Sequence, residues 1–179
     1  MPDALELLKT RRSVKPIELA GPGPTASEIE TLLRIASRVP DHGKLAPWRF
    51  ILFEGDARAA AGEAIASVFR ADRPDATPDQ INFERNRLAR APLVIAVVSR
   101  AGPHVKIPEW EQEISAGASA MSLVFAAHAM AMPRAGSPSG MPMIAACSMP
   151  LAFRRMNGSP VSCTSGARQS PLKTANDQI

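Results

Sequence analysis

The segment HVKIPEWEQEISAGASAMSLVFAAHAM, residues 104–130, holds the longest periodic pattern of the chain. From Glu109 it predicts one long helix, because acidic residues fill the first turns, where the helix dipole favours negative charge. One face carries mainly small and apolar residues at helical spacing: Ile114, Gly117, Ala118, Met121, Phe125 and His128. This face indicates a core helix or a dimer helix, in preference to a functional acidic cluster at residues 109–113.

Two strands are expected upstream of this helix. PLVIAVVS, residues 92–99, is a continuous run rich in β-branched side chains, as is typical of a fully buried strand. WRFILFEG, residues 48–55, alternates between polar and apolar residues and ends at a glycine.

Further helices are expected around these strands. Asp3 can cap a first helix over ALELLKTRR, and Thr25 with Glu28 forms a capping box before the next, which runs to Ala36. Helical segments also run over residues 56–69 and over INFERNRLAR, residues 81–90. Helices that flank at least two strands predict an α+β fold, with residues 1–130 as one domain.

Length and composition limit the class of protein. A chain of 179 residues suits one domain, and no apolar run is long enough to cross a membrane. The N-terminus MPDALELLKTRRS lacks the apolar core of a secretory signal. Both cysteines, Cys147 and Cys163, lie late in the chain, so we expect no metal site, no disulfide framework and a cytoplasmic location.

The net charge of +4 does not indicate nucleic-acid binding. Residues 1–130 hold 16 basic and 16 acidic residues, whereas residues 131–179 hold five basic residues and one acid. A nucleic-acid site needs its basic residues on a folded face or in a known motif. The excess charge lies instead in a segment without any periodic pattern.

Two groups of polar residues are candidates for binding. Arg11, Arg12 and Ser13 follow the first helix, and two guanidiniums with a hydroxyl suit a phosphate group. The alternative is that these arginines only satisfy the end of the helix. Arg38 and His42 lie in the loop RVPDHGKLAPW, where His42 could donate to a ligand or could be a solvated histidine in a turn. Glycine-rich phosphate loops, a nucleophile elbow and metal-ligand spacings are absent from the sequence.

Taken together, four segments resemble the nitroreductase family. They are ALELLKTRRSVK, PTASEIETLLRIASRVPDHGKLAPWRF, RAPLVIAVVS and KIPEWEQEISAGASAMSLVFAAHA. The chain is most similar to a small bacterial subgroup of NAD(P)H nitroreductases, and the resemblance runs in order from residue 3 to about residue 130.

The resemblance implies an α+β homodimer with FMN at the interface and with NADH or NADPH as cosubstrate. It assigns FMN contacts to Arg11, Arg12 and Ser13, and further FMN contacts to Arg38 and His42. It assigns the nicotinamide nucleotide to residues 126–131, namely Ala126, Ala127, His128, Ala129, Met130 and Ala131. The family's Trp-containing FMN segment and its last core strand are missing after the long helix.

The implied activity is hydride transfer from NAD(P)H through flavin to a nitroaromatic, quinone-like or other small oxidant. The flavin carries the chemistry, so no catalytic side chain and no metal are expected. The alternatives are a non-catalytic flavin-binding protein and an inactive truncated fragment. Because the FMN segment is missing, we expect weak FMN binding, and because the loss of a buried core strand exposes apolar surface, we expect poor solubility.

Residues 131–179 break every earlier pattern, with six of the 17 prolines and no helical or strand period. Back-translated and read one nucleotide out of frame, this tail permits an aromatic, acid-containing segment followed by a turn and an apolar strand. At three dipeptides the residue in that frame is determined without any choice of codon: Met141–Pro142 gives Ala, Met143–Ile144 gives Asp and Met156–Asn157 gives Glu. We infer that one base is lost after Met130 and that the chain is disordered or poorly determined from about residue 133; a natural low-complexity tail is the alternative.

Overall fold

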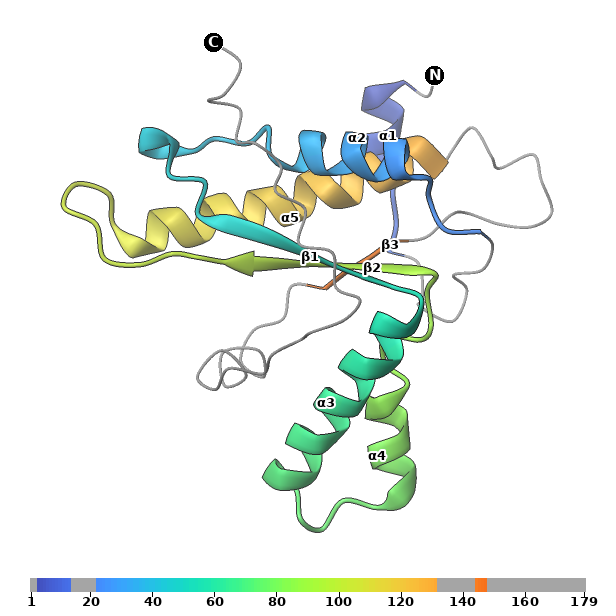
Figure 1. Cartoon of the computed structure of the whole chain (residues 1–179). Helices are drawn as coiled ribbons and strands as arrows, with labels where there is room; N and C mark the ends of the chain where they lie inside the picture. Colours follow the sequence, from blue (N-terminus) through green and yellow to red (C-terminus); the bar gives the residue numbers. More distant parts are fainter. Residues whose placement is uncertain (1–2, 14–21, 132–143, 148–179) are drawn as a thin grey trace.

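The computed structural model describes residues 3–13, 22–131 and 144–147 (Figure 1). Its sheet has the strand order β1 (Trp48–Glu54), β2 (Leu93–Ser99) and β3 (Ile144–Cys147). β1 and β2 are antiparallel, with Trp48 opposite Ser99, whereas β2 and β3 are parallel, with Leu93 opposite Ile144. As the sequence predicts, β2 is buried from Leu93 to Val97.

The helices are α1 (Ala4–Thr10), α2 (Ala26–Ala36), α3 (Asp56–Asp72), α4 (Pro78–Arg85) and α5 (Glu109–Ala131). A short 3-10 helix over His42–Lys44 lies between α2 and β1. Figure 1 shows α2 lying along α5 on one side of the sheet, whereas α3 and α4 form a hairpin that projects from the end where β1 finishes. This mixture of helices and one small sheet confirms the predicted α+β class.

Two apolar clusters cover the sheet. The larger joins α2 and α5 to β1 and β2, and its largest fully buried side chains are Leu32, Leu33, Leu93, Ile95 and Leu123. The smaller is centred on Phe53, Leu88 and Val94 and is covered by α3. No helix in the described ranges is long and apolar enough to cross a membrane.

Helix boundaries follow local capping more closely than apolar spacing. The predicted capping box of α2 is present: Glu28 Oε2 accepts from the Thr25 N–H at 2.7 Å, and the Glu28 N–H donates to Thr25 Oγ1 at 3.4 Å. A second box at Thr77 and Gln80 starts α4 three residues before the predicted helix. The segment RADRPDATPD, residues 70–79, has the composition of a loop, because prolines and aspartates dominate it, and the capping box at its end is therefore easily missed.

One short strand in the tail was not predicted from the sequence. The sequence shows no strand period after Met130, yet Ile144–Cys147 forms β3 beside β2. The backbone groups of β2 pair with any extended segment, and Ile-Ala-Ala-Cys is apolar and contains no proline to interrupt the ladder. The predicted disorder from about residue 133 stays a prediction, because apart from Ile144–Cys147 the residues from 133 to 179 lie outside the described part of the chain.

Candidate functional site

The first candidate group lies where α1 ends. Arg11 is the C-cap residue, and its N–H donates to the Leu7 carbonyl at 2.9 Å. Its backbone leaves the helical region, with φ −53° and ψ 126°, so that Arg12 and Ser13 continue as exposed, non-helical residues. The predicted helix end is confirmed to within two residues, and two guanidiniums and a hydroxyl follow one another at it.

The last turns of α5 lie close to this group. Ala126 is buried, whereas Ala127, His128, Ala129 and Met130 are half-buried; Ala131 ends the helix. Burial, and secondarily the positive charge of Arg11, lower the pKa of His128 below its ordinary value of 6.5. The fold therefore brings the residues predicted to bind a phosphate close to the segment predicted to bind the nicotinamide nucleotide. The lowered pKa favours the neutral form of His128 where the two meet.

The second candidate group lies in the loop between α2 and β1. Arg38 is exposed, and its N–H donates to the Ile35 carbonyl at 2.9 Å at the end of α2. His42 begins the 3-10 helix, and its Nδ1 lies 2.8 Å from Glu111 Oε1 in the first turn of α5.

The backbone of this loop is strained and is held by side chains. Gly43, Lys44 and Ala46 have φ values of +71°, +55° and +46°, a left-handed region that is costly for the two residues that have a Cβ. The Asp41 carboxylate accepts from the N–H groups of Leu45 at 3.1 Å and Ala46 at 2.8 Å. Such strain persists only where the surroundings fix it, and it is common at functional sites.

The two candidate groups are far apart within one chain. Figure 1 shows α1 near the C-terminal end of α5 and the 3-10 helix near its N-terminal end. Between Glu111 and His128 the helix spans 17 residues, or about 25 Å at roughly 1.5 Å per residue. One chain therefore brings Arg11 to His128 and His42 to Glu111, but it does not bring the two pairs together.

An exposed apolar stripe runs along α5 between these groups. Trp110, Ile114 and Met121 are 62%, 63% and 40% exposed and share one helix face with the exposed Gly117. A Cβ added to Gly117 would meet nothing within 4 Å, so this face is open to the backbone of another helix. The sequence pattern identified this face without showing that it is exposed.

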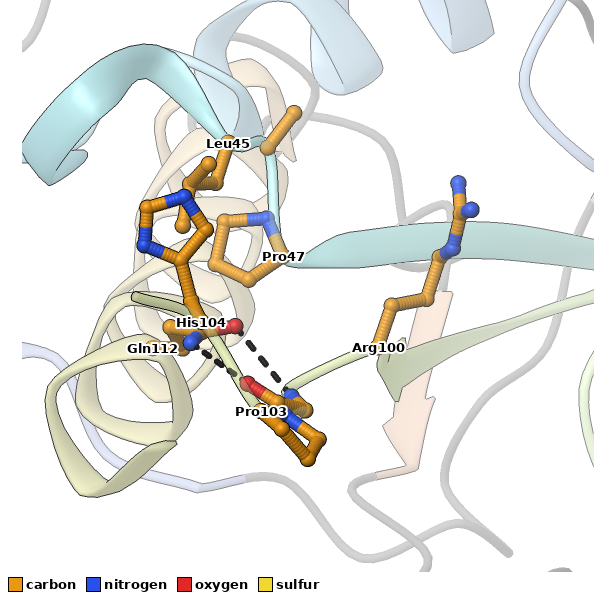
Figure 2. A pocket seen from close by; sticks show the side chains of 8 residues that line it. Leu45, Pro47, Arg100, Pro103, His104 and Gln112 are labelled. Carbon is orange, nitrogen blue, oxygen red and sulfur yellow. Dashed lines mark hydrogen bonds between the residues drawn. The ribbon is translucent and has the colours of Figure 1, made fainter. Parts of the chain in front are cut away.

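A hollow of about 200 Å³ lies between the loop before β1 and the segment after β2 (Figure 2). Gln112 lines the hollow and holds the segment after β2 in place. The Nε2 of Gln112 donates to the carbonyls of Gly102 at 2.8 Å and Ile107 at 3.1 Å, and its Oε1 accepts from the Gly102 N–H at 3.2 Å. Arg100 and His104 line it and were not identified from the sequence, because the lining residues come from three separate segments. No group of three or more His, Cys, Asp or Glu residues suited to a metal gathers in the described ranges.

Comparisons with known proteins agree with the resemblance. A family model described as "Nitroreductase family" matches residues 8–136. "Putative NAD(P)H nitroreductase YdjA" of Escherichia coli (strain K12) is 41% identical over 127 residues, which are 70% of this chain and 66% of that protein. The matched part of the chain thus spans slightly less than two thirds of the length of this relative.

Solved structures show the same fold. The nitroreductase-like family protein from Bacillus cereus has a TM-score of 0.60 at 21% identity, covering 73% of this chain and 67% of that one. The FMN-dependent nitroreductase NfnB from Mycobacterium smegmatis, solved in complex with NADPH, has a TM-score of 0.53 at 18% identity, covering 72% and 71%. These similarities confirm the predicted nitroreductase-like fold.

Proposed function

The chain belongs to the nitroreductase family, and on this premise we propose that it is an FMN-dependent oxidoreductase that uses NADH or NADPH to reduce a small oxidant. The observation that carries the proposal is the family match over residues 8–136, which includes all the candidate binding residues. Nitroaromatic and quinone-like compounds are the class of oxidant proposed. FMN, when bound, supplies the hydride-transfer chemistry between the two substrates.

The residues at the end of α1 suit the phosphate of FMN. Arg12 and Ser13 are exposed, and Arg11 is half-buried beside α5. Within the described residues, none of the ion pairs involves Arg11, Arg12 or Arg38. Arginine forms paired, charge-assisted hydrogen bonds with phosphate oxygens, and a serine hydroxyl adds a short donor. These three side chains would hold and orient the cofactor.

The separation of the candidate groups supports a site shared by two copies of the chain. Two α5 helices that cross antiparallel near Gly117 would bring the Arg11 end of one copy toward the His42 end of the other. The exposed apolar stripe on α5 would be buried in the same contact. We therefore propose a homodimer in which Arg11, Arg12 and Ser13 of one copy and Arg38 and His42 of the other contact one FMN.

The last turns of α5 suit a nicotinamide nucleotide. The small side chains of the half-buried Ala127 and Ala129 leave room for a planar ring, and a neutral His128 adds no second positive charge beside Arg11. We assign residues 126–131 to this cosubstrate. The cytoplasm, where both nicotinamide cosubstrates occur, is the proposed location.

The proposal is tested by adding FMN to the purified chain and then adding NADH or NADPH without oxygen. We expect the flavin fluorescence to be quenched on binding and the visible flavin absorbance to bleach with one or both cosubstrates. Free FMN at the same concentration is the control. Binding without bleaching would support a non-catalytic flavin-binding protein, and absence of binding would contradict the proposed function.

A further inference from the structure

The side chains of His42 and Glu111 are in contact, and Glu111 has no role in the proposed function. The contact joins residues 69 positions apart, with Nδ1 of the imidazole 2.8 Å from Oε1 of the carboxylate. The side chain of His42 is 62% exposed and that of Glu111 is 34% exposed. The side chain of the histidine is thus open to a ligand, whereas that of Glu111 is largely covered.

The chemistry of this contact fixes which ring nitrogen holds a proton. An ionised carboxylate can only accept, so Nδ1 of His42 must be the donor. The other ring nitrogen, Nε2, is then the atom left to meet a ligand. A carboxylate behind a histidine commonly sets the tautomer and the ring orientation in this way.

The backbone around His42 is already fixed by other groups. Ser115 Oγ donates to the Pro40 carbonyl at 2.6 Å, so α5 holds the loop just before His42. After it, Gly43 has a φ of +71°, which favours glycine, and a Cβ there would lie 2.5 Å from Ile107 Cδ1. Gln112 in turn ties the segment that carries Ile107 to α5, through Gly102 (Figure 2) and through the Ile107 carbonyl. The orientation of the imidazole ring is what remains for Glu111 to determine.

We propose that Glu111 is a positioning residue that holds the His42 ring with Nδ1 protonated and presents Nε2 to the FMN site. The inference rests on the proposed function, in which His42 contacts FMN. Glu111 itself touches neither cofactor nor substrate in this scheme. It acts through the histidine and through the geometry of the loop.

The test compares Glu111→Ala and Glu111→Gln with the matched control Glu113→Ala, which removes the same charge from an exposed position two residues along α5. The first readout is the ¹⁵N signature of the His42 ring in the FMN-free chain. We expect Glu111→Ala to change the tautomer of His42, whereas Glu111→Gln keeps an acceptor oxygen and should preserve the tautomer.

The second readout is FMN affinity from fluorescence quenching. We expect a loss of about tenfold in Glu111→Ala, the lower end of the range for removing the partner of a metal-binding histidine, with rescue by Glu111→Gln.

The outcomes separate this inference from the proposed function. An unchanged His42 tautomer in Glu111→Ala would overturn the inference, as would an FMN affinity equal to that of Glu113→Ala. If the unmodified chain binds no FMN, the proposed function fails, and the tautomer in the FMN-free chain still tests whether Glu111 orients His42. If Glu111→Ala does not fold, the test rests on the Glu111→Gln variant. Loss of the Nδ1-protonated tautomer of His42 in folded Glu111→Gln would contradict the role of the acceptor oxygen.

Discussion

At the residue scale, His128 and Arg11 form the electrostatic centre of one half of the proposed site. Burial and the Arg11 guanidinium both disfavour the charged imidazole and lower the pKa of His128. We expect Arg11→Met to raise the pKa of His128 toward 6.5, because one of these two causes is removed. A proton NMR titration of the histidine ring measures this, with Arg12→Met as the matched control. A pKa of His128 that does not change in Arg11→Met would contradict the proximity of the two side chains.

The same lowered pKa has a consequence for stability. Below about pH 6.5 the unfolded chain takes up a proton at residue 128 that the folded chain resists, so the free energy of unfolding falls as the pH falls. His128→Asn removes this titrating group. Its urea midpoint should therefore decrease less between pH 7 and pH 5 than that of the unmodified chain, and an equal decrease would argue against the depressed pKa.

Two serines one turn apart on α5 should respond to alanine in opposite directions. Ser115 Oγ donates to the Pro40 carbonyl, whereas Ser119 Oγ is fully buried and has no hydrogen-bond partner in the described structure. We expect Ser115→Ala to lower the free energy of unfolding by about 1 kcal/mol and Ser119→Ala to raise it by up to about 1 kcal/mol. Urea unfolding of both variants checks this, and equal losses in both would contradict the assigned hydrogen bonds.

At the element scale, the exposed stripe on α5 gives the clearest prediction about assembly. Ile114→Glu places a charge at the centre of the proposed dimer contact, where it would be buried without a partner. We expect the dimer dissociation constant to rise by about tenfold or more, as measured by analytical ultracentrifugation. Val105→Glu is the matched control, because Val105 is 97% exposed and lies outside α5. Equal dimer dissociation constants for the two variants would show that α5 does not form the interface.

Elements with strong local signals were predictable from the sequence, and contacts between distant segments were not. Thr25 and Glu28 mark the start of α2 by a local capping box, and the apolar run over Leu93–Val97 marks a buried strand. Thr77 and Gln80 form an equivalent box, but Pro74, Asp75 and Pro78 around it read as a loop. The His42–Glu111 contact could not be predicted, because nothing in either segment specifies a partner 69 residues away. For the same reason the separation of the candidate groups along α5 required the fold.

At the scale of the whole molecule, the inferred loss of one base after Met130 stays a prediction. The family match ends at residue 136, only a few residues beyond that point. Resequencing the gene across the codons for His128 to Gly140 should find one additional base, which would restore an aromatic segment after α5. If independent isolates carry the same unchanged gene sequence, the missing base is not a sequencing error. Residues 131–179 are then the true continuation of the chain.

The central claim is that one FMN site is built from two copies of this chain. The most direct measurement mixes two variants, Arg12→Ala and His42→Ala, each expected to bind FMN weakly because both of its sites lack one contact. In a mixed dimer one site has both defects and the other has none, so about a quarter of all sites should recover full affinity in an equal mixture that has exchanged subunits. Flavin fluorescence quenching that recovers in the mixture, compared with either variant alone, is the predicted result. A mixture that binds FMN no better than its two components would contradict the shared site.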